Sequence, residues 1–564
     1  MIHVIFRKSA SVHSYQATVS VLCAILPAGV LLWSAPWTAA KSEPRYREYW
    51  SAEVGNQACR PCHQAIYDSY SRTAMARTSG PALPGLEGSF RHAPSGVFYR
   101  VLRDGQTAVL SYERSGPRAL SGRQTLKYYI GSNTRGRAFL FDIEGFLYQT
   151  PINYYAATNT WEMSPGEAQL REMQLNHPVD STCLFCHASR VQPTLKGTLN
   201  GFGGVPFLQD GVSCERCHGP GSDHVNGAAT MVNPAKLTGE RRDGICMQCH
   251  LEGEARIARA GRSQEDYKPG EILSDYLAIF VREDDALQRR GAVSHVESLT
   301  LSRCKRESGD ALSCITCHDP HVQPSAAEKA DYYRTRCMKC HGSTIERHSP
   351  GQQDCTACHM PRLESADIGH TVVTDHRIPR VPQADRPRTR DVGKLVQFGN
   401  PKPDARDLGL AYGQVALRGD AFAERESLRL LENAKQQNPD DPEVLTRLGF
   451  LYQARGDFDT AQTYYERAFK HDPDRAVAAN NLAVFYARRG MLTRSLELWR
   501  NVVDRNPHLS EIGVNFGIGL CAVGDAEAAK AALQRVLKHN PDFGLARQAL
   551  ADLAERGCSR NRVH

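Results

Sequence analysis

Cysteine and histidine recur in this sequence in one fixed arrangement. Fourteen of the 18 cysteines form seven pairs with two residues between them, and a histidine directly follows every pair. This Cys-x-x-Cys-His pattern is typical of c-type haem attachment, in which the adjacent imidazole is the proximal ligand of the iron. Zinc ribbons and thioredoxin-like redox pairs do not need that histidine. The seven motifs are Cys59, Cys62 and His63; Cys183, Cys186 and His187; Cys214, Cys217 and His218; Cys246, Cys249 and His250; Cys314, Cys317 and His318; Cys337, Cys340 and His341; and Cys355, Cys358 and His359.

Six of the seven motifs are crowded into residues 183–359. About 30 residues per motif are too few to build an ordinary aliphatic core around each one. We therefore expect seven covalently attached haem c groups, of which six lie close together and serve as the core of this region.

An electron-transfer haem also needs a second axial ligand, usually histidine or methionine. Eight further histidines lie between the first motif and residue 380. Five are the favoured distal ligands: His224, His295, His321, His370 and His376. Four residues are weaker candidates, with a surface, propionate-bonding or packing role as the alternative: His92, His177, His348 and Met75.

The N-terminus has the pattern of a secretory signal. Arg7 and Lys8 precede an apolar run over residues 19–35 and small residues at 38–40. This pattern predicts a signal peptide over residues 1–40, with an uncleaved anchor as the alternative, and no other segment is apolar enough to span a membrane. Because haem is attached to such motifs outside the cytoplasm, we expect a periplasmic or otherwise extracytoplasmic protein.

The formal net charge of +7 changes once the haems are counted. Removal of residues 1–40 leaves about +5. Each haem with its two propionates contributes about −1 when ferric and about −2 when ferrous. The mature protein would then carry about −2 when oxidised and about −9 when reduced. The basic residues are expected to neutralise propionates, and nucleic acid is excluded as a partner.

Composition divides the chain into segments of different character. Residues 65–77 have helical spacing near the first motif, whereas 98–102, 108–112 and 138–142 are β-like runs separated by turn residues. Residues 381–403 are rich in proline and arginine, as in a linker. The predicted order is signal peptide 1–40, first haem site 41–89, β-rich subdomain 90–170, six-haem region 171–380, linker 381–403 and helical repeats 404–557.

The C-terminal part has a period of 34 residues. Pro439, Pro473, Pro507 and Pro541 keep this spacing. A 34-residue period of this kind resembles tetratricopeptide repeats, which implies about four helical hairpins in a curved solenoid. Residues 546–557 resemble a capping helix, and Cys521 lies at a packed helix position, where we expect it to be part of the core. The predicted fold is mainly α: a multihaem cytochrome c domain with a small β-rich insertion, then the repeat solenoid.

Short segments around the motifs resemble the multihaem cytochrome c superfamily over about residues 46–380. They are Cys217–His224, Cys317–His321, Cys358–Pro361 and Asp375–Arg377. The superfamily includes the tetrahaem electron carrier of ammonia oxidisers, hydroxylamine oxidoreductase and pentahaem nitrite reductase. The resemblance implies stacked haem pairs, with distal histidines supplied by neighbouring motifs.

Two departures concern the enzymes of this group. All seven motifs end in histidine, so the lysine-ligated haem of the nitrite reductase is not present. Tyr332 and Tyr333 precede a motif, but nothing assigns either of them the cross-linking role of the tyrosine in hydroxylamine oxidoreductase. Cys304 is left over, as a structural thiol or as a redox-active or ligating one.

The favoured function is an extracytoplasmic seven-haem cytochrome that transfers electrons between redox partner proteins docked by the repeats. The alternative is a multihaem oxidoreductase that acts on a small nitrogen or sulfur compound at a haem with an open site. A third hypothesis makes the repeats the binding module and the haems a sensor of redox state.

Overall fold

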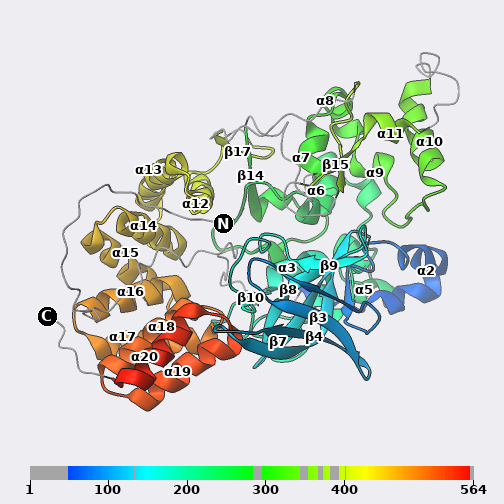
Figure 1. Cartoon of the computed structure of the whole chain (residues 1–564). Helices are drawn as coiled ribbons and strands as arrows, with labels where there is room; N and C mark the ends of the chain where they lie inside the picture. Colours follow the sequence, from blue (N-terminus) through cyan, green and yellow to red (C-terminus); the bar gives the residue numbers. More distant parts are fainter. Residues whose placement is uncertain are drawn as a thin grey trace.

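The computed structural model describes residues 49–558, except 133, 284–294, 343–353, 366–371, 382–392 and 401. The predicted signal peptide and two candidate ligands, His348 and His370, lie outside these residues. A first helix is followed by a β-rich body, a region of short helices with the other motifs, and a curved array of longer helices (Figure 1). The fold is thus mainly helical with one β-rich part, as the sequence predicts.

The first motif lies on helix α2 (Asn56–Tyr70). Gly55 at its N-cap has a φ of 82°, a conformation that glycine adopts without a Cβ penalty. The helix is kinked at His63, where φ is −120° and ψ is 37°. It ends at Tyr70, short of the predicted residue 77, where the Ser71 hydroxyl donates to the Tyr67 carbonyl at 2.7 Å and so competes with the helical pattern.

The β-rich body consists of two antiparallel sheets that share one apolar core. Side chains alternate along the strands, so that Tyr99 and Val101 on one strand face inward with Leu110 and Tyr112 on the next. The first sheet is β2 (Gly88–Arg91), β3 (Phe98–Asp104), β4 (Thr107–Arg114) and β5 (Leu120–Leu126). The second is β1 (Ser79–Pro81), β6 (Tyr128–Ile130), β7 (Gly136–Ile143), β8 (Phe146–Tyr155), β9 (Thr160–Met163) and β10 (His177–Pro178).

Short helices carry the other six motifs. No residue of α9, α10 or α11 is buried, which is expected where the protein itself builds little apolar core. The helices are α3 (Ser181–His187), α4 (Glu215–His218), α5 (Ser222–Val225), α6 (Gly239–His250), α7 (His295–Thr300), α8 (Arg303–Ser308), α9 (Cys314–Cys317), α10 (Lys329–His341) and α11 (Cys355–His359). Two strand pairs accompany them: β11 (Ser189–Val191) with β12 (Phe207–Gln209), and β15 (Arg362–Glu364) with β16 (Val372–Thr374).

The segment predicted as a linker is not a linker throughout. It contains β17 (Leu395–Gln397), which pairs with β14 (Leu277–Arg282), itself paired with β13 (Ala255–Ala258). Leu395 is buried in one cluster with Phe280 and with residues of the first repeat helix. Its amide donates to the Tyr412 hydroxyl at 2.9 Å. This small sheet therefore joins the motif region to the repeats.

The C-terminal helices form four antiparallel hairpins and a final helix, as the 34-residue period predicts. Gly419, Gly456, Gly490 and Gly524 have φ between 74° and 90° at the turns inside the hairpins, which explains why glycine recurs there. The helices are α12 (Ala405–Ala416), α13 (Ala421–Gln437), α14 (Pro442–Ala454), α15 (Phe458–His471), α16 (Ala476–Arg488), α17 (Leu492–Arg505), α18 (Ser510–Ala522), α19 (Ala526–His539) and α20 (Gly544–Arg556).

Both ends of this array pack on the rest of the protein (Figure 1). At the first end, the Arg259 guanidinium donates to the Asp407 carboxylate at 2.6 Å. At the far end, the Tyr148 hydroxyl and His539 Nδ1 are 2.8 Å apart, and the Asn176 amide donates to the His508 carbonyl at 2.7 Å. The repeats therefore contact the rest of the protein at two separated points. One is the motif region at the first end of the array, and the other is the β-rich body at the far end.

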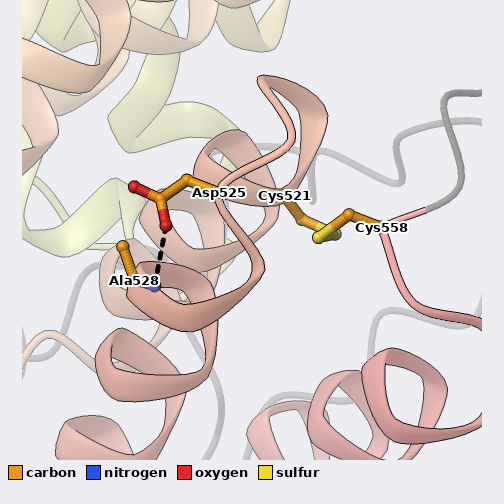
Figure 2. The surroundings of a disulfide bond; sticks show 4 residues. All are labelled: Cys521, Asp525, Ala528 and Cys558. Carbon is orange, nitrogen blue, oxygen red and sulfur yellow. Dashed lines mark hydrogen bonds between the residues drawn. A yellow bond between two sulfur atoms is a disulfide. The ribbon is translucent and has the colours of Figure 1, made fainter.

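A disulfide closes the end of the array. Cys521 on α18 bonds to Cys558 just after α20, with a Cα–Cα distance of 5.1 Å (Figure 2). Next to it, Asp525 caps α19 by accepting from the Ala528 amide at 3.0 Å. The expectation that Cys521 is only a core residue was wrong, because α20 returns across α18 and brings the tail to it.

Candidate haem site

One large cavity connects the motifs. All seven motif histidines line it, and so do all the motif cysteines except Cys62. Its volume is about 3130 Å³, well above the 300–1,000 Å³ or so of an ordinary small-molecule pocket. The space and the lining residues fit several large prosthetic groups held side by side.

Cysteines of different motifs also lie in contact. In four cases a thiol of one motif lies close enough to a thiol of another to shift its pKa. These contacts connect the first motif with the third, the second with the fourth, the fourth with the fifth, and the sixth with the seventh. The pairs are Cys59 with Cys214, Cys186 with Cys249, Cys246 with Cys314, and Cys337 with Cys355. Groups attached at these cysteines would be close neighbours.

Three predicted distal histidines face motif histidines across a gap. The rings of His218 and His321 have centres 6.0 Å apart and planes 15° apart. The other two pairs are His63 with His224, at 6.4 Å and 22°, and His318 with His376, at 6.2 Å and 29°. Because a metal–imidazole bond is about 2 Å long, two imidazoles on opposite sides of one iron have centres roughly 6 Å apart. Each gap has the size that one iron requires.

His295, at the start of α7, lies between two other histidines. Its ring centre is 5.6 Å from that of His250 and 5.0 Å from that of His376, at nearly perpendicular angles. Its Nδ1 is buried and forms no hydrogen bond with the described residues. This placement brings His295 to the fourth motif.

In seven of these histidines Nδ1 is occupied, which leaves Nε2 as the nitrogen that could bind a metal. Carbonyl oxygens lie 2.7 to 3.1 Å from Nδ1 of four of them, and the others contact hydroxyl or carboxylate oxygens. A Nδ1–H that donates to a carbonyl fixes the tautomer whose Nε2 lone pair is free for a metal. The pairs are His218 with Val232, His224 with Ala229, His359 with Pro379, His376 with Thr374, His187 with Thr78, His318 with Tyr333, and His321 with Asp319.

Burial lowers the pKa of six of the cavity histidines. It lowers the pKa of His187 and His318 to about 4 and that of His295 to about 3, and neighbouring histidine charges add to the effect. The pKa values of His218, His250 and His376 are lowered for the same first reason. A neutral imidazole is the form that binds a metal.

Two weaker candidates do not line this cavity. His92 is buried in the β-rich body, where Nδ1 contacts the Ser95 hydroxyl at 2.8 Å and Nε2 contacts the Ala168 carbonyl at 3.0 Å. His177 lies on β10 near His508 of the repeats, and burial lowers its pKa. Met75 does line the cavity. The sequence placed His92 and His177 among the weaker candidates but could not show their actual contacts, because their partners Ala168 and His508 lie far along the chain.

The remaining sequence candidates lie beside the fifth motif. Cys304 lines the cavity near Cys317 and Cys337. The Tyr333 hydroxyl is 3.3 Å from Nδ1 of His318, and the Tyr332 hydroxyl accepts from the Asp319 amide at 3.0 Å. Both tyrosines therefore position residues of this motif, a role that the sequence did not reveal.

His187 differs from His63, His218, His250 and His318, each of which has a second histidine in ring contact. Among the described residues, no second histidine makes a ring contact with it. The hairpin tip between β6 and β7 lies close by, because the Gly131 amide donates to the carbonyl of Thr78, the residue whose hydroxyl contacts His187. Arg135 and Arg137 of this hairpin line the cavity.

Family models match two parts of the chain. The model described as cytochrome c554 and c-prime matches residues 150–219, which include the second and third motifs. A tetratricopeptide-repeat model matches residues 424–479. Each match thus falls in the part of the chain where the sequence and the fold indicate that kind of structure.

Individual relatives are distant. Multiheme cytochrome MtrA of Shewanella baltica (strain OS185) is 26% identical over 192 residues, 30% of this chain and 56% of that protein, so the chain spans about half the length of this curated relative. The uncharacterized protein ycf37 of Cyanophora paradoxa is 25% identical over 119 residues, 21% of this chain and 68% of that one. The crystal structure of MamA is 17% identical, covers 26% of this chain and 86% of its own, and has a TM-score of 0.23.

The motifs, the cavity and the family matches agree with one another. No helix in the described part of the chain combines the length and the apolar character needed to cross a membrane. The family matches and the similarity to MtrA support a multihaem cytochrome region followed by tetratricopeptide repeats.

Proposed function

We propose that this chain is an extracytoplasmic seven-haem cytochrome that passes electrons between redox partners. The observation that carries the proposal is the set of facing histidine pairs inside one cavity lined by all seven motifs. Haem c, when bound, supplies one-electron redox chemistry. The protein's part is to hold the irons close together with two axial ligands each, so that electrons move from one to the next.

The proposed ligand sets follow from the ring geometry. His224 serves the iron of His63, His321 that of His218, and His376 that of His318. His295 serves the iron of His250. His370 remains a proposed distal ligand, and His348 and Met75 remain weaker ones.

An extracytoplasmic location is supported by chemistry at both ends of the chain. The Cys521–Cys558 disulfide forms and persists in oxidising compartments. The N-terminal residues have the composition of a signal peptide. Both features point to export.

The repeats are proposed to dock a redox partner protein. Because α12 and the last helices are used in contacts with the body, the exposed faces of α14–α17 are the proposed docking surface. Deleting residues 404–564 would remove bracing contacts together with this surface, so deletion does not test docking cleanly.

The haem count tests the proposal directly. We expect the pyridine haemochrome assay on the purified, full-length protein to give seven haems per chain, with bis-histidine low-spin spectra for most of them. Six or fewer haems per chain, in a sample whose polypeptide is shown to be full length by its mass, would contradict the proposed set of sites.

A second candidate function rests on His187. Because no histidine among the described residues makes a ring contact with it, its iron is a candidate for an open face, beside Thr78 and the β6–β7 hairpin. A multihaem oxidoreductase acting on a small nitrogen or sulfur compound would use such a site. We expect a ferric high-spin electron paramagnetic resonance signal that shifts when nitrite, hydroxylamine or sulfite is added. A protein whose haems are all low-spin, and whose spectrum does not change on addition of any of these three compounds, would argue against this activity.

A further inference from the structure

Three charged side chains meet where the first three motifs approach one another. Glu215 and Arg216 are the two residues between Cys214 and Cys217, and Glu53 lies just before α2. Glu53 is 6% exposed, Glu215 0% and Arg216 2%. Haem attachment needs none of these three residues, and buried charged groups are costly unless they have a partner or a role.

Glu215 ties the third motif to the start of α2. One carboxylate oxygen accepts from the amides of Val54 and Gly221 at 2.8 Å, and the other accepts from the Gly55 amide at 2.9 Å. The Val54 and Gly55 amides lie at the N-terminal end of α2, which favours a negative charge, and the Gly221 amide lies at the start of α5. Both oxygens are therefore committed to backbone groups, and Glu215 has a structural role.

Arg216 supplies a fixed positive charge. Its guanidinium lies over Phe185 of the second motif, 4.1 Å from the ring centre, and 4.9 Å from that of Trp50. Its Nε and Nη1 are buried without a hydrogen-bond partner among the described residues, and the side chain lines the cavity. Arginine does not lose its proton in proteins, so these buried N–H groups would be stabilised by an anion that accepts their hydrogen bonds. The propionate of a haem bound in the cavity would be such an anion.

Glu53 is the member of the cluster that can change its charge. Its Oε1 is buried without a hydrogen-bond partner in the described part of the chain. The pKa of Glu53 is raised to about 7, chiefly by burial; Arg216 and Arg190 oppose this rise and Glu215 adds to it. Tyr49 also faces it, and burial raises the pKa of that phenol to about 12, so Tyr49 stays neutral.

We propose that Glu53 is a redox-linked proton site, which takes up one proton from solvent when electrons reach the neighbouring irons and releases it when they leave. Arg216 is the positioning residue that keeps a fixed charge between this carboxyl and the second and third motifs. An electron comes from the redox partner, and the carboxylate gains a proton to become a carboxylic acid, so that the added negative charge is compensated. The inference rests on the proposed electron-transfer function.

Thermodynamic linkage makes this proposal measurable. If reduction favours protonation of Glu53, then protonation must favour reduction by the same free energy. The midpoint potential of the nearest haems should therefore fall as the pH rises through neutrality, and stop changing well above it.

The test is a spectroelectrochemical titration of the full-length holoprotein from about pH 5.5 to pH 8.5. We expect Glu53→Gln, which keeps the size of the side chain, to lose most of the pH dependence shown by the wild-type protein near neutrality. The matched control is Glu167→Gln: Glu167 is 3% exposed, burial raises its pKa, and it lies in the β-rich body, where its charge acts on Tyr99. That variant should keep the wild-type dependence.

A second readout does not depend on potentials. The infrared difference spectrum between reduced and oxidised protein should contain a protonated-carboxyl band that Glu53→Gln loses and Glu167→Gln keeps. The proposal is overturned if the midpoint potentials of the wild-type protein do not change with pH across this range, a result that needs no variant. It is also overturned if Glu53→Gln keeps both the pH dependence of the potential and the protonated-carboxyl band. A haem count on the same samples separates this failure from failure of the proposed function.

Discussion

His321→Ala should convert the iron of the Cys214–Cys217–His218 motif from six-coordinate low-spin to five-coordinate high-spin. The His218 and His321 rings face each other with centres 6.0 Å apart and planes 15° apart, and Asp319 contacts Nδ1 of His321 at 3.3 Å. Removing one strong-field axial ligand leaves the iron with an open face, and its reduction potential changes with its ligand set. Electron paramagnetic resonance should show one new high-spin ferric haem per chain, with the other signals unchanged.

His92→Ala is the control for this experiment. His92 is a buried histidine outside the cavity, and both of its ring nitrogens are occupied by Ser95 and Ala168. Its loss should affect stability and leave every haem spectrum as it was. A fully low-spin His321→Ala protein, or a high-spin signal in His92→Ala, would contradict the proposed assignment.

The attachment sites could be predicted from sequence because they are local. Two thiols and an imidazole within five residues define the covalent chemistry, whatever the surrounding fold. The repeats and the strands β3, β4 and β7 were equally accessible, because a period of 34 and an alternation of apolar residues are visible along the chain.

The pairing of histidines could not be predicted in this way. His224 follows His218 by six residues, yet its ring faces His63. His321 follows the fifth motif and faces His218 of the third. Which rings meet depends on how separate helices approach one another, so reasoning from sequence neighbours gives the wrong partner.

Contacts between distant segments could not be predicted from the sequence for the same reason. Strand β17 looked like linker because its surroundings are rich in proline and arginine, but β14 and Tyr412 bind it from two sides. The Cys521–Cys558 bond spans 37 residues, about one repeat, and forms only because α20 lies across α18.

Asp542→Ala should destabilise the attachment of the repeats to the β-rich body by about 3–5 kcal/mol. Asp542 is fully buried; it accepts from Arg114 at 2.8 and 2.5 Å and from the Met173 amide at 2.9 Å. Arg118 approaches the same carboxylate at 3.3 Å. The alanine variant leaves the Arg114 guanidinium, 9% exposed, without its buried counter-charge, which costs more than the pair itself contributes.

Denaturant unfolding of the holoprotein, followed by far-ultraviolet circular dichroism, should therefore show an earlier transition for Asp542→Ala. Glu555→Ala is the matched control, since Glu555 lies on α20 with 74% of its side chain exposed, and a surface change of this kind is expected to alter stability by less than about 0.5 kcal/mol. The haem spectra of both variants should match the wild type, because neither residue lines the cavity. If Asp542→Ala and the control unfold at the same denaturant concentration, the far end of the array is held by other contacts, such as that of Tyr148 with His539. An early transition with intact haem spectra would instead establish the repeats as a brace that can loosen without disturbing the electron-transfer core.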